Sequence, residues 1–179
     1  MQFTDGNWLM LPGVNGQYPV QVYDVEAEAD SLTIYAPTRK INHRGATLDG
    51  AVLAIKLFSP LPDVIGVRIY HHAGGKERGP RFELQENSAK DIKITTDECE
   101  VSLESGSLRA TALKKKNFAL EFYSGGKLIT KSDHRSMAYL EVDGKGSYLR
   151  EQLRLGVGEC VYGLGERFTA FVKNGQSID

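Results

Sequence analysis

Short apolar runs separated by glycine-rich turns recur along the whole chain, at a spacing of roughly ten residues. The runs are rich in Val, Ile, Leu, Tyr and Phe, residues that favour strands, and 19 glycines punctuate them. No stretch of about twelve or more residues keeps a helical period between capping signals at both ends. Because a parallel sheet needs crossover helices, the pattern predicts antiparallel sheets.

The middle of the chain shows this pattern most clearly. Apolar and polar residues alternate in 101–104 and again in 107–113, with the turn Ser105-Gly106 between them, and a second hairpin turns at 124–126. We expect strands at residues 20–25, 32–35, 52–58, 64–71, 92–95, 100–104, 107–113, 119–123, 127–131, 138–142, 147–155 and 160–164. The sequence therefore predicts an all-β protein, folded as an antiparallel β-sandwich.

Size and charge exclude several classes of protein. The chain has 179 residues, and 22 basic against 23 acidic side chains give it a net charge of −1. One core is expected at this length, and no electrostatic attraction to nucleic acid or anionic lipid. The longest apolar stretches fall short of a membrane span, and the first residues lack a secretory signal. We expect a cytoplasmic protein in which Cys99 and Cys160 are reduced, buried thiols.

The sequence offers no metal, cofactor or catalytic site. His71 and His72 are adjacent on a predicted strand, so their side chains point to opposite faces and cannot share one ion. Residues 163–168 begin like a dinucleotide-binding loop, but Phe168 replaces the third glycine and no βαβ unit surrounds it. Hydrolysis by paired carboxylates needs a fixed separation, which 23 acids in a sequence cannot identify.

Two segments carry residues to which we assign structural or interdomain roles. Gly163 and Gly165 fit a strand that ends at a sharp bend, where Glu166, Arg167 and Phe168 would hold the exit from the sandwich. Glu166 and Arg167 suit ion pairs across an interface.

The other segment holds the single tryptophan. Trp8 lies ahead of the first clear strand, and packing in a core or an interface is favoured over stacking on a sugar. The charge run Lys114-Lys115-Lys116 is typical of a solvated turn between strands.

Several segments together resemble the start of bacterial α-xylosidases in glycoside hydrolase family 31. The matching pieces are Asp5-Gly6-Asn7-Trp8-Leu9, residues 19–25, Gly79-Pro80, residues 155–159 and, above all, residues 161–170. The resemblance implies an N-terminal β-sandwich of the galactose mutarotase-like kind, incomplete as a fragment, ahead of a (β/α)₈ barrel.

The family's chemistry belongs to that barrel. The resemblance implies a cytoplasmic, retaining, exo-acting enzyme that removes α-linked xylose from oligosaccharides without a cofactor, using two aspartates of the barrel. Residues 1–168 would form the sandwich domain. Residues 169–179 would start the segment that continues toward a substrate-facing loop. We expect these 179 residues alone to be inactive, and their uncovered edges allow a homo-oligomer.

Two other classes remain open at this point. A free-standing carbohydrate-binding β-sandwich would need aromatic residues on one face, and the tyrosines are scattered. A mutarotase-like isomerase would need a histidine and a carboxylate brought together, and no acid can be identified for that role.

Overall fold

The regular secondary structure of the described residues consists almost entirely of strands. The computed structural model describes residues 3–5, 9–71, 91–166 and 168–176. Two larger sheets form the body and two smaller sheets lie beside it. The four-stranded sheet contains β4 (Asp24–Ala27), β5 (Ser31–Pro37), β6 (Val52–Phe58) and β7 (Gly66–Tyr70), in that order. The five-stranded sheet has the order β12 (Lys127–Ser132), β11 (Leu120–Ser124), β10 (Leu108–Leu113), β9 (Glu100–Ser105) and β8 (Ile92–Thr96).

The smaller sheets hold the remaining strands. In one, β13 (Ala138–Val142) lies between β14 (Gly146–Arg150) and β3 (Val14–Gln17); in the other, β1 (Thr4–Asp5) pairs with β2 (Leu9–Met10). One short 3-10 helix, η1 (Arg44–Leu48), projects from the connection between β5 and β6. Within the described residues, no helix is long and apolar enough to span a membrane.

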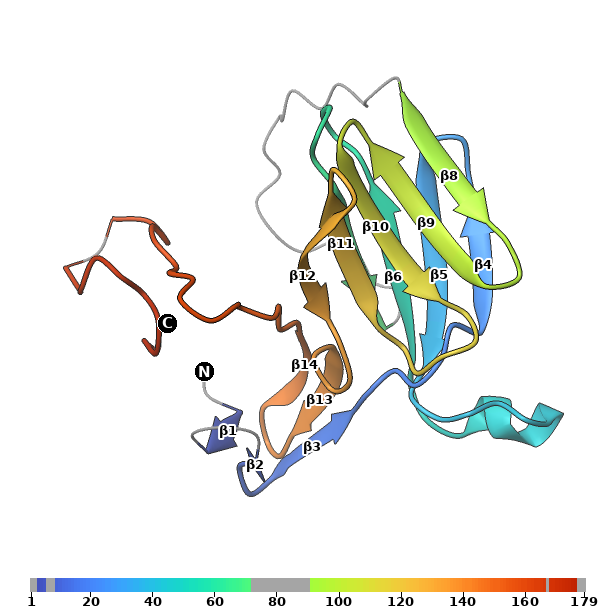
Figure 1. The fold of residues 1–179 in the computed structure, drawn as a ribbon. Coiled ribbons are helices and arrows are strands. Elements are labelled where there is room, and N and C mark those ends of the chain that lie inside the picture. The colour runs from blue at the N-terminus through green and yellow to red at the C-terminus, as the bar shows by residue number, and fades with distance from the viewer. Residues whose placement is uncertain (1–2, 6–8, 72–90, 167, 177–179) are drawn as a thin grey trace.

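The two larger sheets pack face to face as a β-sandwich (Figure 1). Alternation in β5 and β6 points every second side chain inward, where β9, β10 and β11 supply the opposite layer. The fully covered apolar side chains of the two layers are Leu32, Ile34, Ala36, Leu53, Ile55, Leu57, Val101, Leu103, Ala110 and Leu120. The predicted antiparallel β-sandwich is confirmed.

The two predicted hairpins are also confirmed. Strands β9 and β10 pair antiparallel from Ser105↔Leu108 to Glu100↔Leu113, on either side of the turn that contains Gly106. Gly106 has φ +59°, a conformation that favours glycine. Strands β11 and β12 pair across Gly125-Gly126, with a register shift between Phe122 and Tyr123.

Five expectations from the sequence were wrong. The strand expected at 20–25 begins only at Asp24 and runs to Ala27 as β4, because the backbone bonds of Val20 to Pro37 and of Tyr23 to Tyr35 do not continue as a ladder. Residues 160–164 form no strand, because Gly163 and its two successors all have positive φ, which a strand cannot accommodate. The strand expected at 147–155 ends at Arg150. Cys99 and Cys160 are exposed and unpaired, because both lie outside the strands in turn or irregular segments.

A carboxylate joins the two layers of the sandwich at one end. Asp63, in the turn between β6 and β7, accepts hydrogen bonds from the backbone N–H of Ser107 at 2.6 Å and from its hydroxyl at 2.8 Å. These bonds favour the ionised form, so they lower the pKa of Asp63 below its ordinary value of 3.8. The turn of one sheet is thereby tied to the hairpin of the other.

This tie predicts a specific loss of stability in acid. Because the folded pKa of Asp63 lies below the unfolded one, its contribution is complete above the unfolded value and disappears as the pH falls through the folded value. Asp63 has φ +59°, which asparagine also tolerates, so Asp63→Asn removes the charge without disturbing the backbone. When the pH is lowered from about 7 to about 3, a range that includes the ordinary pKa of an aspartate, we expect the melting temperature of the variant to fall less than that of wild type.

The matched control is Asp30→Asn, an equal change of charge at an exposed turn between β4 and β5. It is expected to leave the acid dependence as in wild type. An identical acid dependence for Asp63→Asn and wild type would show that this carboxylate contributes nothing to the link between the sheets.

Candidate functional site

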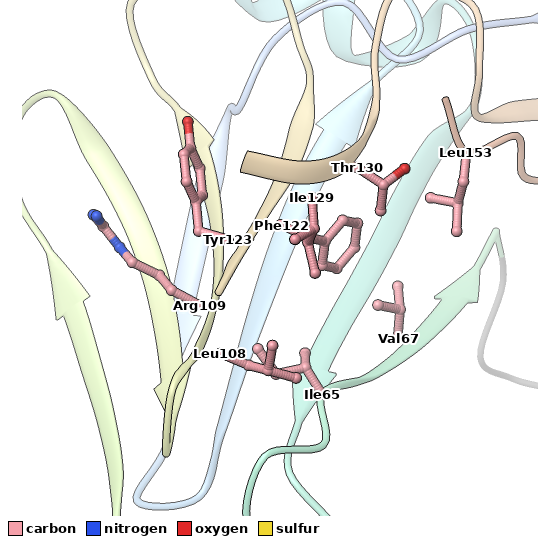
Figure 2. Close-up of a pocket in the computed structure, with 9 residues that line it drawn as sticks. All are labelled: Ile65, Val67, Leu108, Arg109, Phe122, Tyr123, Ile129, Thr130 and Leu153. Carbon is pink, nitrogen blue, oxygen red and sulfur yellow. The ribbon is translucent and has the colours of Figure 1, made fainter. Parts of the chain in front are cut away.

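An apolar hollow lies at the open side of the sandwich, between the edge strands β7 and β12. It is a cleft of about 270 Å³, lined by Ile65, Val67, Leu108, Arg109, Phe122, Tyr123, Ile129, Thr130 and Leu153. Figure 2 shows the aliphatic side chains and Phe122 gathered together, whereas Arg109 and Tyr123 point away from them. Among the described residues, the cleft is therefore an end of the apolar core that other side chains leave open.

Leu153 reaches the cleft from the segment that follows β14. This segment is attached to the edge of β12, because the N–H of Arg154 donates to the carbonyl of Lys131 at 2.9 Å and the hydroxyl of Thr130 donates to the carbonyl of Arg154 at 2.7 Å. None of the described residues that line the cleft is an acid or a histidine. Its surface can bind an apolar group, and the tyrosine at its margin, Tyr123, points away from the apolar side chains.

Three carboxylates elsewhere in the described chain are engaged in structural contacts. Hydrogen bonds from Ser31, from Ser107 and from the backbone N–H of Glu100 lower the pKa of Glu28, Asp63 and Asp97, respectively. A general acid at neutral pH needs a raised pKa instead. These three groups are therefore unsuited to donate the proton in glycoside hydrolysis.

Glu151, just after β14, shows the opposite shift. Desolvation by the surrounding protein raises its pKa, against the lowering effects of Ser132 and Arg150. Glu151 is nevertheless exposed to solvent, so its raised pKa reflects nearby protein atoms and not enclosure in a pocket. Retaining hydrolysis requires a second carboxylate at about 5 Å as the nucleophile.

The histidine considered for a metal or an isomerase has structural neighbours. His71 Nδ1 lies 3.3 Å from the carbonyl of Val52, and its ring lies 4.2 Å from the ring of Tyr139 in β13. His72 lies outside the described residues. Within the described part of the chain, no three His, Cys, Asp or Glu side chains are grouped so that they could hold a metal ion.

The residues assigned structural or interdomain roles lie on the irregular segment after β14. Gly163 and Gly165 have φ values of +84° and +83°, and a Cβ on either would meet nothing within 4 Å. Their backbone conformation, and not close packing, explains the glycines. Glu166 and Phe168 are exposed. Trp8 and Arg167 lie outside the described residues, so the structural role of the set stays a prediction.

Two residues that the sequence analysis did not assign organise this segment. Asn174 and Lys173 hydrogen-bond back to residues 159–161 and 169–170 and close a loop. The pair Asn174-Gly175 is a turn signal, but the sequence gives no indication of the partner across the loop. The predicted domain boundary at residue 168 falls within this loop and stays a prediction.

Comparison with known families assigns the chain. The family model of the glycosyl hydrolase 31 N-terminal galactose mutarotase-like domain matches residues 54–179. The chain belongs to this domain family. The chain is 38% identical over 180 residues to alpha-xylosidase XylQ of Lactiplantibacillus pentosus and 30% identical over 202 residues to an alpha-xylosidase of Emericella nidulans. Both matches cover the whole chain but only 23% and 25% of these relatives.

Solved structures show the same fold at lower sequence identity. The cycloalternan-forming enzyme of Listeria monocytogenes, solved in complex with a pentasaccharide substrate, matches with a TM-score of 0.65 and 16% identity. The match covers 94% of this glycosyl hydrolase 31 N-terminal domain and 14% of that enzyme. The family resemblance expected from the motifs is confirmed by the family model and by the two alpha-xylosidase matches.

Proposed function

We propose that this chain is the non-catalytic N-terminal β-sandwich of a retaining, exo-acting α-xylosidase, and that it packs on a downstream (β/α)₈ barrel and helps to shape its active site. One observation carries the proposal. The whole chain matches an alpha-xylosidase at 38% identity, yet it spans only 23% of that relative. The substrate proposed for the parent enzyme is an α-xyloside oligosaccharide, and no cofactor is required.

The side chains of the described residues support a non-catalytic role. The apolar cleft carries no acid, and three carboxylates with lowered pKa values are held by structural hydrogen bonds. We also assign Gly163, Gly165, Glu166 and Phe168 to the contact with the barrel, together with Arg167 and Trp8. Two exposed, unpaired cysteines suit the reducing cytoplasm, the compartment we propose.

The substrate is tested with the parent polypeptide that carries residues 1–179. We expect kcat/KM to be higher for p-nitrophenyl α-xyloside than for the α-glucoside, because the relatives that the chain matches along its whole length are alpha-xylosidases. Matched concentrations of both substrates in one assay provide the comparison. A preference for the glucoside would leave the fold and the family in place and overturn the xylosidase proposal.

A further inference from the structure

A polar hollow lies at the end of the sandwich from which η1 projects. It measures about 680 Å³, a size typical of small-molecule sites. Three segments form it: the stretch before β4, the connection from β5 to η1, and the turn between β10 and β11. Figure 1 shows the connection that carries η1 and the turn between β10 and β11 at the same end of the sandwich. Half of the lining side chains of this lysine hollow are Lys40, Lys114, Lys115 and Lys116.

Backbone hydrogen bonds hold the three segments together. The N–H of Val20 donates to the carbonyl of Pro37 at 2.9 Å, and the carbonyl of Val20 accepts from the N–H of Phe118 at 3.1 Å. The N–H of Lys114 donates to the carbonyl of Cys99 at 2.8 Å, which ties the lysine turn to the turn between β8 and β9. The walls of the hollow are therefore formed in advance, so that binding has to order little of the backbone.

Neighbouring acids balance only part of the positive charge. The ammonium of Lys114 donates to the carbonyl of Asp97 at 2.6 Å, and the Asp97 carboxylate interacts electrostatically with Lys114 and Lys115. The ammonium of Lys115 also lies 3.7 Å from the carboxylate of Glu98. The other two lysines form no ion pair with the described part of the chain. Four ammoniums beside two carboxylates leave a charge of about +2 at the hollow.

Uncharged hydrogen-bonding groups complete the lining. The amide side chains of Gln21, Asn42 and Asn117 line the hollow and form no hydrogen bond with another described residue. In the adjoining hollow, by contrast, the side-chain carbonyl of Gln17 accepts from the hydroxyl of Thr38 at 3.2 Å. The amide there supports the fold, whereas the amides of the lysine hollow are accessible to a ligand.

We propose that the lysine hollow binds a phosphate monoester of a small hydroxyl-bearing molecule, of which a sugar phosphate is the simplest example. A phosphate monoester carries about −1.5 to −2 charges near neutral pH, which matches the charge left at the hollow. Lysine ammoniums bind phosphoryl oxygens as point charges, and amides both donate to and accept from hydroxyl groups. The inference is independent of the proposed α-xylosidase activity.

Calorimetric titration of the parent polypeptide with glucose 6-phosphate tests the site. We expect a Kd below about 1 mM. Replacing the two lysines that lack an ion pair, by Lys40→Gln together with Lys116→Gln, should weaken binding about tenfold, the combined effect of two ion pairs near the surface. Equal affinity of this double variant and wild type would overturn the proposed site.

The matched control removes two exposed lysines that lie outside the hollow, by Lys127→Gln together with Lys145→Gln. The change of net charge is the same, but solvent and salt screen these distant charges. The Kd for glucose 6-phosphate should therefore stay within about twofold of wild type. A loss of affinity equal to that of the first double variant would overturn the site as well, because net charge alone would then explain the binding.

Inorganic phosphate tests the contribution of the amides. It should bind at least about threefold more weakly than glucose 6-phosphate, because it offers no sugar hydroxyls to the amides. Asn42→Ala should weaken the binding of glucose 6-phosphate and leave that of inorganic phosphate unchanged. Inorganic phosphate that binds as tightly as glucose 6-phosphate, or unphosphorylated glucose that displaces glucose 6-phosphate, would overturn the assignment to a phosphate monoester.

Discussion

Leu103→Ala is expected to lower the free energy of unfolding of the chain by about 2–5 kcal/mol, the cost of deleting buried methyl groups from a packed core. Leu103 is fully covered in the centre of the five-stranded sheet, opposite Ala110 on one side and Ile94 on the other. Neither alanine nor an edge isoleucine can fill the space that the leucine would leave. Because domains are stable by only about 5–15 kcal/mol, this change removes a large share of the total.

The same substitution at an exposed leucine provides the control. Leu48 on η1 is 91% exposed, so Leu48→Ala is expected to change stability by less than about 0.5 kcal/mol. Urea unfolding of both variants and the wild type, followed by circular dichroism, measures the difference. Equal shifts of the midpoint for the two variants would contradict the position of the core.

The sandwich could be predicted from the sequence because its central pairings are local. The hairpin of β9 and β10 follows from alternation on both sides of Gly106, and β6 matches the expected strand from Val52 to Phe58. In such hairpins the turn sets the register. The two strands of each hairpin therefore lie close together in the sequence.

The third sheet could not be predicted in the same way. Its strand β3 pairs with β13, so Gln17 lies opposite Tyr139, far away in the sequence. Short strands with a single buried face carry little periodicity, and nothing local identifies a distant partner. The segment around Val14 therefore gave no strand signal, although it forms one edge of the three-stranded sheet.

The exposed cysteines show the limit of residue preferences. Cys99 is exposed because it lies in the turn between β8 and β9, where its N–H donates to the Asp97 carboxylate at 2.6 Å. Cysteine is typically buried, but the geometry of this turn exposes Cys99. A turn at Asp97, identified from the sequence, would have predicted that the thiol of Cys99 is exposed.

The loop closed by Lys173 and Asn174 was anticipated in part. The glycines at 163 and 165 indicated an unusual backbone, and the family motif pointed to the same residues. The closure by Asn174 and Lys173 was not predictable, because it depends on side chains that meet only after the loop has formed. The expected strand at 160–164 was wrong because of the positive φ values that begin at Gly163, and the N–H of Val161 is satisfied by Asn174 instead of a neighbouring strand.

The largest expected effect separates this chain from its parent. Enzymes accelerate their reactions by at least about 10⁶-fold, and the parent should show such turnover of p-nitrophenyl α-xyloside. The 179-residue chain should show none above buffer, because the proposed catalytic carboxylates belong to the barrel. Among the carboxylates of the described residues, Glu151 has a raised pKa, as a proton donor requires, so Glu151→Gln is the informative variant.

The assay of the purified chain and the parent on this substrate, side by side, tests the central claim most directly. The account predicts turnover by the parent, none by the chain, and parent activity within about tenfold of wild type for Glu151→Gln, since loss of a general acid or base typically costs 10²–10⁴-fold. Turnover by the chain alone that disappears with Glu151→Gln, or with replacement of another of its acids, would contradict it.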